Sequence, residues 1–272
     1  MITVFTPTYN REDTLRILYK SLKNQTMKDF QWVVVDDGSK DKTENLIKSF
    51  IQEGEINILY KKIKNGGKMR AINIGLSLAS EEYFFIVDSD DYLNEKALEL
   101  IQEEIVTLPS DFAGIVFRKV EVNKNGEIKY KDESFGEDQI DSNPIDIFYN
   151  KKILKDKAEI IKTSIMREFP FPEIENEKFF PEGYIWNKIG EHYSFRYIDK
   201  GIYYYKYLID GYTKRFEEVL KENPKGFKKY YFYMIGKNIP IKNKIKFIIR
   251  FIQSKYYDIK KNRGKWWKYY IL

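Results

Sequence analysis

Residues 83–91 read YFFIVDSDD, five apolar residues followed by three aspartates and a serine. A short continuous apolar run that ends in polar turn residues predicts a strand buried on both faces of a parallel sheet. Three carboxylates so close together repel one another unless a cation neutralises them, and hard divalent cations prefer oxygen ligands. The sequence therefore favours a metal site directly after this strand, with an acidic turn that caps the next helix as the alternative.

Strand and helix patterns alternate around this segment. Further strands are expected at residues 2–5, 32–35 and 56–60, and apolar residues recur at helical spacing between and after them. The helical stripes are Leu15, Leu18, Tyr19 and Leu22; Leu46, Ile47, Phe50 and Ile51; Met69, Ile72, Leu76 and Ala79; and Leu98, Ile101 and Ile105. This alternation predicts an α/β fold with a mostly parallel, doubly wound sheet and helices on both faces.

After Pro109 the predicted elements become shorter. The pattern predicts strands at 115–122, 127–131, 160–166 and 198–207, and helices at 182–192 and 242–261. The first two of these strands are separated by Lys124-Asn125-Gly126, which is typical of a hairpin turn.

Composition limits the chemistry that this chain can perform. The 272 residues include no cysteine and one histidine, which excludes disulfide scaffolds, cysteine nucleophiles and metal sites that need two imidazoles. No apolar run approaches the roughly 20 residues of a membrane span, and the N-terminus lacks a basic leader. We therefore expect carboxylates to carry the chemistry, in a cytoplasmic protein.

The charge is distributed unevenly. Residues 221–272 carry 15 Lys and Arg against 2 Asp and Glu, a net of +13, whereas the rest of the chain carries −7. Within this stretch, one face of the expected helix holds Ile245, Ile248, Ile249, Ile252, Tyr256 and Ile259. Contact with an anionic membrane, self-association and packing on its own domain all stay open for this face. Nucleic acid ranks last, because no recognition motif is present.

Polar segments follow each of the first four strands, at residues 6–11, 36–39, 64–70 and 88–91. In open α/β sheets, ligands bind at the carboxyl ends of the strands, so these four segments should share one edge. Carboxylates would then stand beside Arg11, Lys68 and Arg70, an arrangement suited to a divalent cation and a phosphorylated ligand. Taken singly, each segment is also compatible with an ordinary turn or helix start.

These segments resemble, in order and spacing, the family 2 glycosyltransferases with a GT-A fold. The matching motifs are Thr6-Pro7-Thr8-Tyr9-Asn10, Asp36-Asp37-Gly38-Ser39, Asn65-Gly66-Gly67 through Arg70-Ala71-Ile72-Asn73, and Asp88-Ser89-Asp90-Asp91. The resemblance covers about residues 1 to 110. It implies transfer of a sugar from a nucleotide donor with inversion, most often from a UDP-sugar with Mn²⁺ or Mg²⁺.

The resemblance also implies roles for individual residues. It places Lys68 and Arg70 near the base or the diphosphate, Asp88 on the ribose, and Asp90, with Asp91, on the metal. The residues that it assigns to the uracil pocket are Pro7, Tyr9, Arg11 and Asp37, of which Asp37 would accept the N3–H of the base.

The implied catalytic base lies in the second half of the chain. Residues 180–188 are similar to the family segment that opens a helix below the acceptor site, and Glu182 is the candidate base. Many relatives carry a Glu-Asp pair where this sequence has Glu182-Gly183, and a carboxylate at a helix N-terminus also suits the helix dipole alone. Asp199 and Asp210 are weaker substitutes.

The resemblance implies a GT-A domain with a nucleotide-sugar-binding half (1–110) and an acceptor-binding β/α half (111–215). The charge and the helical spacing predict a basic, aromatic helical extension (216–272) after it. The expected reaction moves a hexose such as glucose, or its N-acetyl form, to a hydroxyl of a surface polysaccharide or protein-linked glycan. The extension would contact a second copy or the inner face of the membrane. The alternative is a catalytically silent UDP-sugar-binding or organising domain of a larger enzyme. A dinucleotide-dependent dehydrogenase is disfavoured, because no G-x-G-x-x-G follows the first strand.

Overall fold

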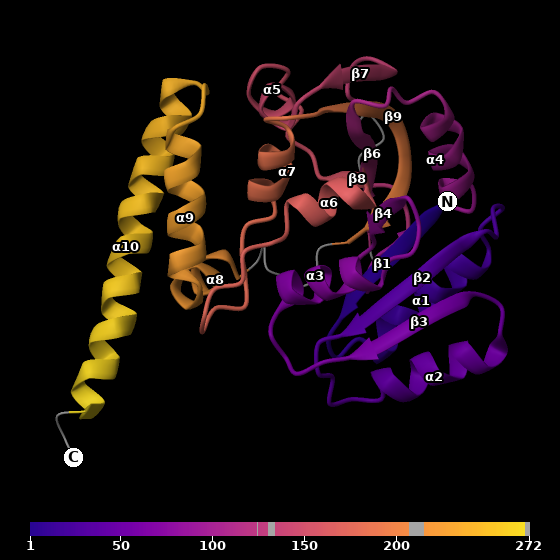
Figure 1. Cartoon of the computed structure of the whole chain (residues 1–272), viewed down its shortest axis with the longest axis horizontal. Coiled ribbons are helices and arrows are strands. Elements are labelled where there is room, and N and C mark those ends of the chain that lie inside the picture. Colours follow the sequence, from indigo (N-terminus) through magenta and orange to yellow (C-terminus); the bar gives the residue numbers. More distant parts are fainter. Residues whose placement is uncertain (124, 130–133, 207–214, 270–272) are drawn as a thin grey trace. The chain divides into compact units, whose positions relative to one another are not determined.

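The structure is a computed structural model that describes residues 1–123, 125–129, 134–206 and 215–269, the last seven of them as backbone only (Figure 1). The chain divides into two compact units. The first unit comprises Met1–Pro170 and Ile185–Lys206, and the second comprises Phe171–Tyr184 and Tyr207–Leu272.

A nine-stranded sheet forms the centre of the first unit, in the order β3-β2-β1-β4-β8-β6-β9-β5, with β7 paired to β9. The strands are β1 (Ile2–Thr8), β2 (Phe30–Asp36), β3 (Asn57–Lys62), β4 (Tyr83–Ile86), β5 (Tyr92–Leu93), β6 (Phe112–Glu121), β7 (Gln139–Ser142), β8 (Lys157–Lys162) and β9 (Ser194–Tyr205).

The sheet is mixed. Strands β3, β2, β1 and β4 are parallel, as expected, but β8 is antiparallel to both β4 and β6, and β9 runs parallel to β6. Two successive reversals leave β6 and β9 pointing in the same direction as β4. The carboxyl ends of β1, β2, β3, β4, β6 and β9 therefore lie at the same edge of the sheet, which is where α/β sheets bind ligands.

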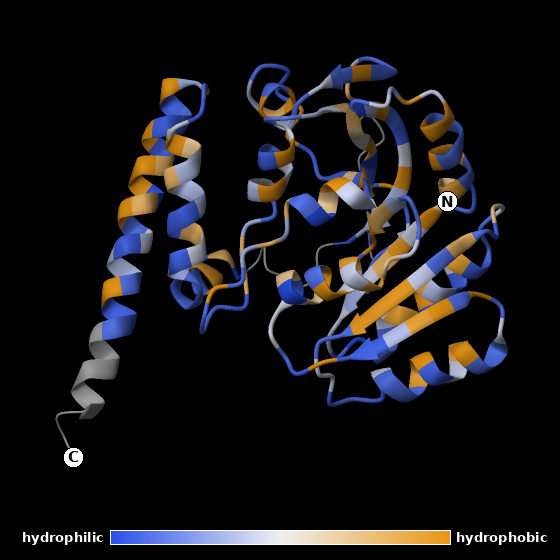
Figure 2. Ribbon diagram, in the orientation of Figure 1, coloured by the Kyte–Doolittle hydropathy of each residue, from blue (hydrophilic) through white to orange (hydrophobic). Residues whose placement is uncertain are grey.

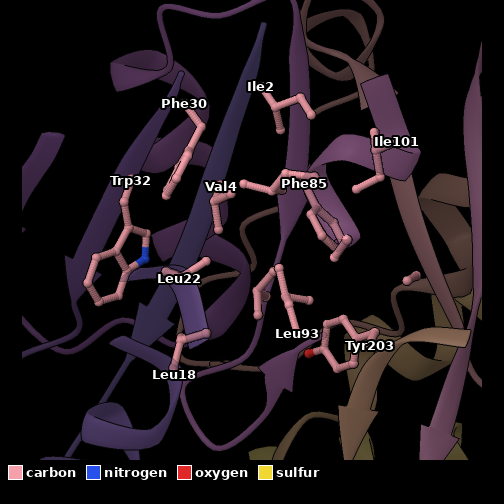
Figure 3. Close-up of a cluster of buried hydrophobic side chains, with 14 of the residues drawn as sticks. Ile2, Val4, Leu18, Leu22, Phe30, Trp32, Phe85, Leu93, Ile101 and Tyr203 are labelled. Atoms are coloured by element: carbon pink, nitrogen blue, oxygen red, sulfur yellow. The ribbon is translucent and has the colours of Figure 1, made fainter. Parts of the chain in front are cut away.

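Helices cover both faces of the sheet, as the sequence predicts. Helices α1 (Glu12–Lys23), α2 (Thr43–Glu53) and α4 (Ala97–Val106) contribute to an apolar core with Val4, Trp32 and Phe85 (Figure 3). Helix α3 (Lys68–Leu78) packs on the opposite face, where a Cβ atom on Gly75 would lie 2.1 Å from the ring of Phe5. Glycine is needed at this position because any side chain would collide with the ring.

Several boundaries after residue 109 differ from the prediction. The strand expected at 160–166 ends at Lys162, and α6 (Thr163–Glu168) follows, because the Thr163 backbone N–H and hydroxyl donate to the carbonyls of Glu82 and Glu81 and turn the chain. The strand expected at 127–131 contributes one bridge, between Ile128 and Val122, and its residues 130–131 lie outside the described residues. Helix α5 (Pro144–Tyr149) and strand β7 were not predicted. Strand β9 confirms the strand predicted at 198–207, of which residue 207 lies outside the described residues, and helix α7 (Gly183–Ile189) confirms the helix predicted at 182–192.

The second unit contains α8 (Phe216–Glu222), α9 (Pro224–Ile235) and α10 (Ile241–Tyr269). All three lie in the region 216–272 that was predicted to be helical, but only α10 was predicted with bounds of its own. Val219, Leu220, Phe227 and Tyr231 form its apolar centre. The segment 171–184 joins this unit because the Glu177 carboxylate accepts the backbone N–H groups of Lys225 and Gly226, each at 2.8 Å, and so caps the start of α9. In the part of the chain that the structure describes, no helix is both long and apolar enough to cross a bilayer.

Candidate functional site

The segments after β1 and β2 are bound to each other. The Asn10 backbone N–H donates to Ser39 Oγ at 2.9 Å, and Asn10 Oδ1 accepts the N–H of Lys40 at 2.8 Å. Asp36 is fully buried and accepts the Ser39 N–H at 2.7 Å and the Tyr60 hydroxyl at 2.9 Å. The Asp36 carboxylate therefore stabilises the loop after β2, whereas the Asp37 carboxylate contacts the third segment.

Asp37 joins the third segment to this pair. Its two carboxylate oxygens accept the backbone N–H groups of Gly66 (2.6 Å) and Gly67 (2.8 Å), and its carbonyl accepts the Asn65 side-chain amide at 2.8 Å. Gly67 has φ +96°, a conformation that side chains disfavour. A carboxylate oxygen can accept more than one hydrogen bond, so this structural role is compatible with the predicted contact to a base.

The fourth segment meets the third through an ion pair. Lys68 opens α3, and its Nζ lies 2.7 Å from Asp88 Oδ1. Burial alone would raise the pKa of Asp88, but the charges of Lys68, Lys119 and Arg11 outweigh it and lower the pKa, so Asp88 is ionised at neutral pH. The structure thus brings Arg11 and Lys68 to the Asp88 loop, as the sequence predicts.

Asp90 and Asp91 are crowded next to this charge. Burial and the negative charge of Asp88 raise the pKa of both carboxyls, that of Asp91 to about 8. Within the described ranges, no three His, Cys, Asp or Glu side chains are arranged to hold a metal ion by themselves. This donor set still fits a hard cation, because Mg²⁺ is usually held by one or two carboxylates together with substrate phosphates.

Two residues that the sequence analysis did not single out complete this edge. The Tyr203 hydroxyl donates to Asp91 Oδ2 at 2.7 Å and accepts the Asp88 backbone N–H at 2.9 Å, and Lys119 Nζ lies 3.9 Å from the centre of the Tyr203 ring. Lys119 and Tyr203 are register partners near the carboxyl ends of β6 and β9. Ligands bind at the carboxyl ends of strands in α/β sheets, but this rule could have pointed to Lys119 and Tyr203 only if the directions of β6 and β9 had been known.

The raised pKa of Asp91 predicts how stability depends on pH in EDTA. In the unfolded chain the carboxyl titrates near 3.8, whereas the fold keeps it protonated up to about pH 8. The folded state then binds the extra proton between these values, so the free energy of unfolding falls as the pH rises from about 4 to about 8, by up to about 1.4 kcal/mol per pH unit.

We expect Asp91→Asn to flatten this fall, because asparagine still accepts from Tyr203 but carries no charge. Denaturant unfolding of both proteins at pH 5 to 8 measures the difference. The matched control is Asp111→Asn, an exposed carboxylate before β6 at the opposite edge of the sheet. Equal slopes for the Asp91 variant and the unaltered chain would contradict the prediction.

The remaining predicted residues lie as follows. Pro7 is buried within β1, and Tyr9 is 43% exposed directly after it. Arg70 is exposed on α3, and its side chain lies over Gly66, where a Cβ atom would be 2.6 Å from Arg70 Cδ. Glu182 is half-buried and directly precedes α7, in the segment that belongs to the second unit.

A model of glycosyl transferase family 2 matches residues 3–169, which include all four segments. The chain belongs to glycosyl transferase family 2. Glycosyltransferase GlyA of Streptococcus pneumoniae is 39% identical over 112 residues, which are 41% of this chain and 16% of GlyA. A Campylobacter jejuni protein named GalNAc(5)-diNAcBac-PP-undecaprenol beta-1,3-glucosyltransferase is 27% identical over 211 residues, 75% of this chain and 64% of the relative. The chain thus spans less than two thirds of either protein.

Solved structures of the family share the fold. S. aureus TarS residues 1–349, determined in complex with UDP-GlcNAc, superimposes with a TM-score of 0.69 at 22% identity, covering 94% of this chain and 72% of that one. The predicted GT-A fold with helices on both faces of a central sheet is therefore confirmed, although the sheet is mixed where a mostly parallel one was expected.

Proposed function

We propose that this family 2 member is an inverting glycosyltransferase that moves a sugar from a UDP-sugar to a hydroxyl of a glycan acceptor. The observation that carries the proposal is the convergence of Arg11 and Lys68 on the Asp88–Asp91 loop, at the carboxyl edge of the sheet. Basic side chains can bind a diphosphate, and carboxylates beside them can bind the divalent cation that accompanies it.

Pro7, Tyr9, Arg11 and Asp37 form the proposed uracil pocket. Tyr9 is exposed enough to offer its ring to a base, while Asp37 stands in a loop fixed by Gly66 and Gly67. Asp88 would bind the ribose. Lys68 and Arg70 would face the diphosphate, where Lys68 would divide its charge between the ligand and Asp88.

Asp90 is the proposed ligand for Mn²⁺ or Mg²⁺, with Asp91 beside it. Asp91 is 7% exposed and one of its oxygens accepts from Tyr203, so its free oxygen is the one left for a cation. When bound, the cation would stabilise the charge that develops on the departing UDP. The protein's own part is to hold the Asp91 carboxylate and the Asp88 backbone in place through Tyr203.

Glu182 is the proposed base. Its carboxylate would take the proton of the acceptor hydroxyl while the acceptor oxygen bonds to C1 of the sugar and the C1–O bond to UDP breaks. One displacement inverts the anomeric centre, and no covalent glycosyl-enzyme forms.

The relatives guide the choice of sugar and acceptor. TarS was determined with UDP-GlcNAc, and the name of the C. jejuni relative gives glucosyl transfer to an undecaprenol-linked glycan. We therefore favour glucose or an N-acetylhexosamine as the sugar, and a surface polysaccharide or protein-linked glycan precursor as the acceptor, used at the cytoplasmic side of the membrane.

Calorimetric titration with UDP in Mn²⁺ and then in EDTA tests the proposal, with GDP and NAD as controls. We expect UDP to bind in Mn²⁺, at least tenfold more weakly in EDTA, and more tightly than either control. Hydrolysis of UDP-glucose or UDP-GlcNAc should then follow. UDP binding without turnover of any UDP-sugar would favour the silent binding domain, and absence of UDP binding would overturn both.

A further inference from the structure

Helix α10 has two apolar faces. Phe247, Phe251 and Tyr257 are partly buried and pack on the apolar centre of the second unit, with Ser254 fully buried among them. A second set of apolar side chains on the same helix is 42–72% exposed. This outer face consists of Ile241, Ile245, Ile248, Ile249, Ile252, Tyr256 and Ile259.

The outer face is a continuous stripe. At about 100° per residue, its seven side chains fall within an arc of about 100°, opposite to the face that holds Phe247, Phe251 and Ser254. Figure 2 shows hydrophobic and hydrophilic residues alternating along the ribbon of α10. Lysines border the stripe on both sides. Lys242, Lys246 and Lys260 lie along one border, and Lys244 and Lys255 lie along the other.

Negative charge is scarce on this helix. Residues 241–269 contain a single acidic residue, Asp258, and its carboxylate pairs with Lys228 of α9 on the packed side. The partner of the outer face must therefore supply apolar contact for the isoleucines and negative charge for both rows of lysines. A second copy of α10 supplies the first but not the second, since its lysines would meet lysines.

We propose that the outer face of α10 binds the surface of an anionic phospholipid bilayer. The isoleucines would enter the boundary between headgroups and acyl chains, Tyr256 would lie at the headgroup level, and the bordering lysines would extend to the phosphates. This inference goes beyond the proposed function, because it holds whether or not the acceptor is lipid-linked.

Vesicle sedimentation of the whole chain tests the proposal. We expect binding to phosphatidylcholine vesicles that contain 30 mol% phosphatidylglycerol, and at least tenfold weaker binding to pure phosphatidylcholine or in 0.5 M NaCl. The double variant Ile248→Glu/Ile252→Glu should bind the anionic vesicles at least tenfold more weakly. Both side chains are exposed, at 42% and 60%, so the variant should keep its helical circular dichroism.

Ile17→Glu is the matched control, because Ile17 is 48% exposed on α1 in the first unit. It should bind vesicles like the unaltered chain, and UDP affinity should be the same in all three proteins, which separates this proposal from the proposed function. Absence of vesicle binding, or an equal loss in the Ile17 control, would overturn the proposal. The proposal would also be overturned if, without vesicles, the unaltered chain formed a concentration-dependent dimer and the double variant stayed monomeric. The outer face of α10 would then bind a second copy of the chain.

Discussion

Replacing Asp90 by asparagine is expected to lower Mn²⁺-dependent sugar transfer at least about 100-fold while the chain stays folded. A carboxylate that binds a divalent cation contributes several kcal/mol to stabilising the leaving group, and an amide oxygen carries no charge to replace it. Each 1.36 kcal/mol of lost stabilisation lowers the rate tenfold. UDP affinity should also become insensitive to EDTA, because the cation links the protein to the diphosphate.

The fold should survive this change, since burial and the charge of Asp88 already disfavour the ionised form of Asp90. Removing a disfavoured charge does not lower stability. Steady-state transfer and calorimetric UDP binding, each with Mn²⁺ and with EDTA, measure the effect, and Asp111→Asn is the control. Unchanged turnover in the Asp90 variant would reject this residue as the metal ligand.

The first half of the site follows from the sequence because local patterns determine it. Residues 32–35 and 83–87 are apolar enough to be strands wherever they pair, and parallel pairing then brings the residues after them to one edge. The contact between Lys68 and Asp88 needs more than this, because β2 and β1 lie between β3 and β4 in the sheet. The backbone of Gly66 and Gly67 is bound to Asp37 after β2, and this brings Lys68 back toward Asp88.

The second half depends on pairings between distant segments, which a single sequence does not display. Strand β8 lies antiparallel between β4 and β6. Only this arrangement brings the carboxyl ends of β6 and β9 to the edge of the sheet that holds the Asp88–Asp91 loop. Tyr203 looked like one more apolar strand residue, although its hydroxyl holds Asp91 and the Asp88 backbone 115 residues away in the chain. The bounds of α8 and α9 within the predicted helical extension were not found, because Pro224 and Gly226 interrupt the helical pattern, although proline is well suited to the first turn of α9.

Glu182→Gln is expected to lower sugar transfer about 100- to 10,000-fold, the usual contribution of a general base, with UDP-sugar affinity unchanged within about twofold. Glutamine has nearly the same shape as glutamate but cannot take the acceptor proton. The side chain directly precedes α7, so the substitution leaves the helix itself intact. Single-turnover transfer and calorimetric binding of the UDP-sugar separate the chemical step from donor binding, and Glu175→Gln, an exposed carboxylate in the same segment, is the control.

The pH profile gives an independent check on the role of Glu182. A carboxylate base must be ionised, so kcat/KM of the unaltered enzyme should fall on the acid side, and this limb should disappear from the residual activity of the variant. Loss of donor binding would instead move Glu182 to the donor pocket. Full activity would require another base, and of the two substitutes Asp199 is already paired with Arg118 at 2.5 Å, while Asp210 lies outside the described residues. The Asp199 side chain is 12% exposed and lies against this guanidinium, so an acceptor hydroxyl would have to displace Arg118 to reach its carboxylate. We therefore propose Glu182 as the base to test first, ahead of Asp199.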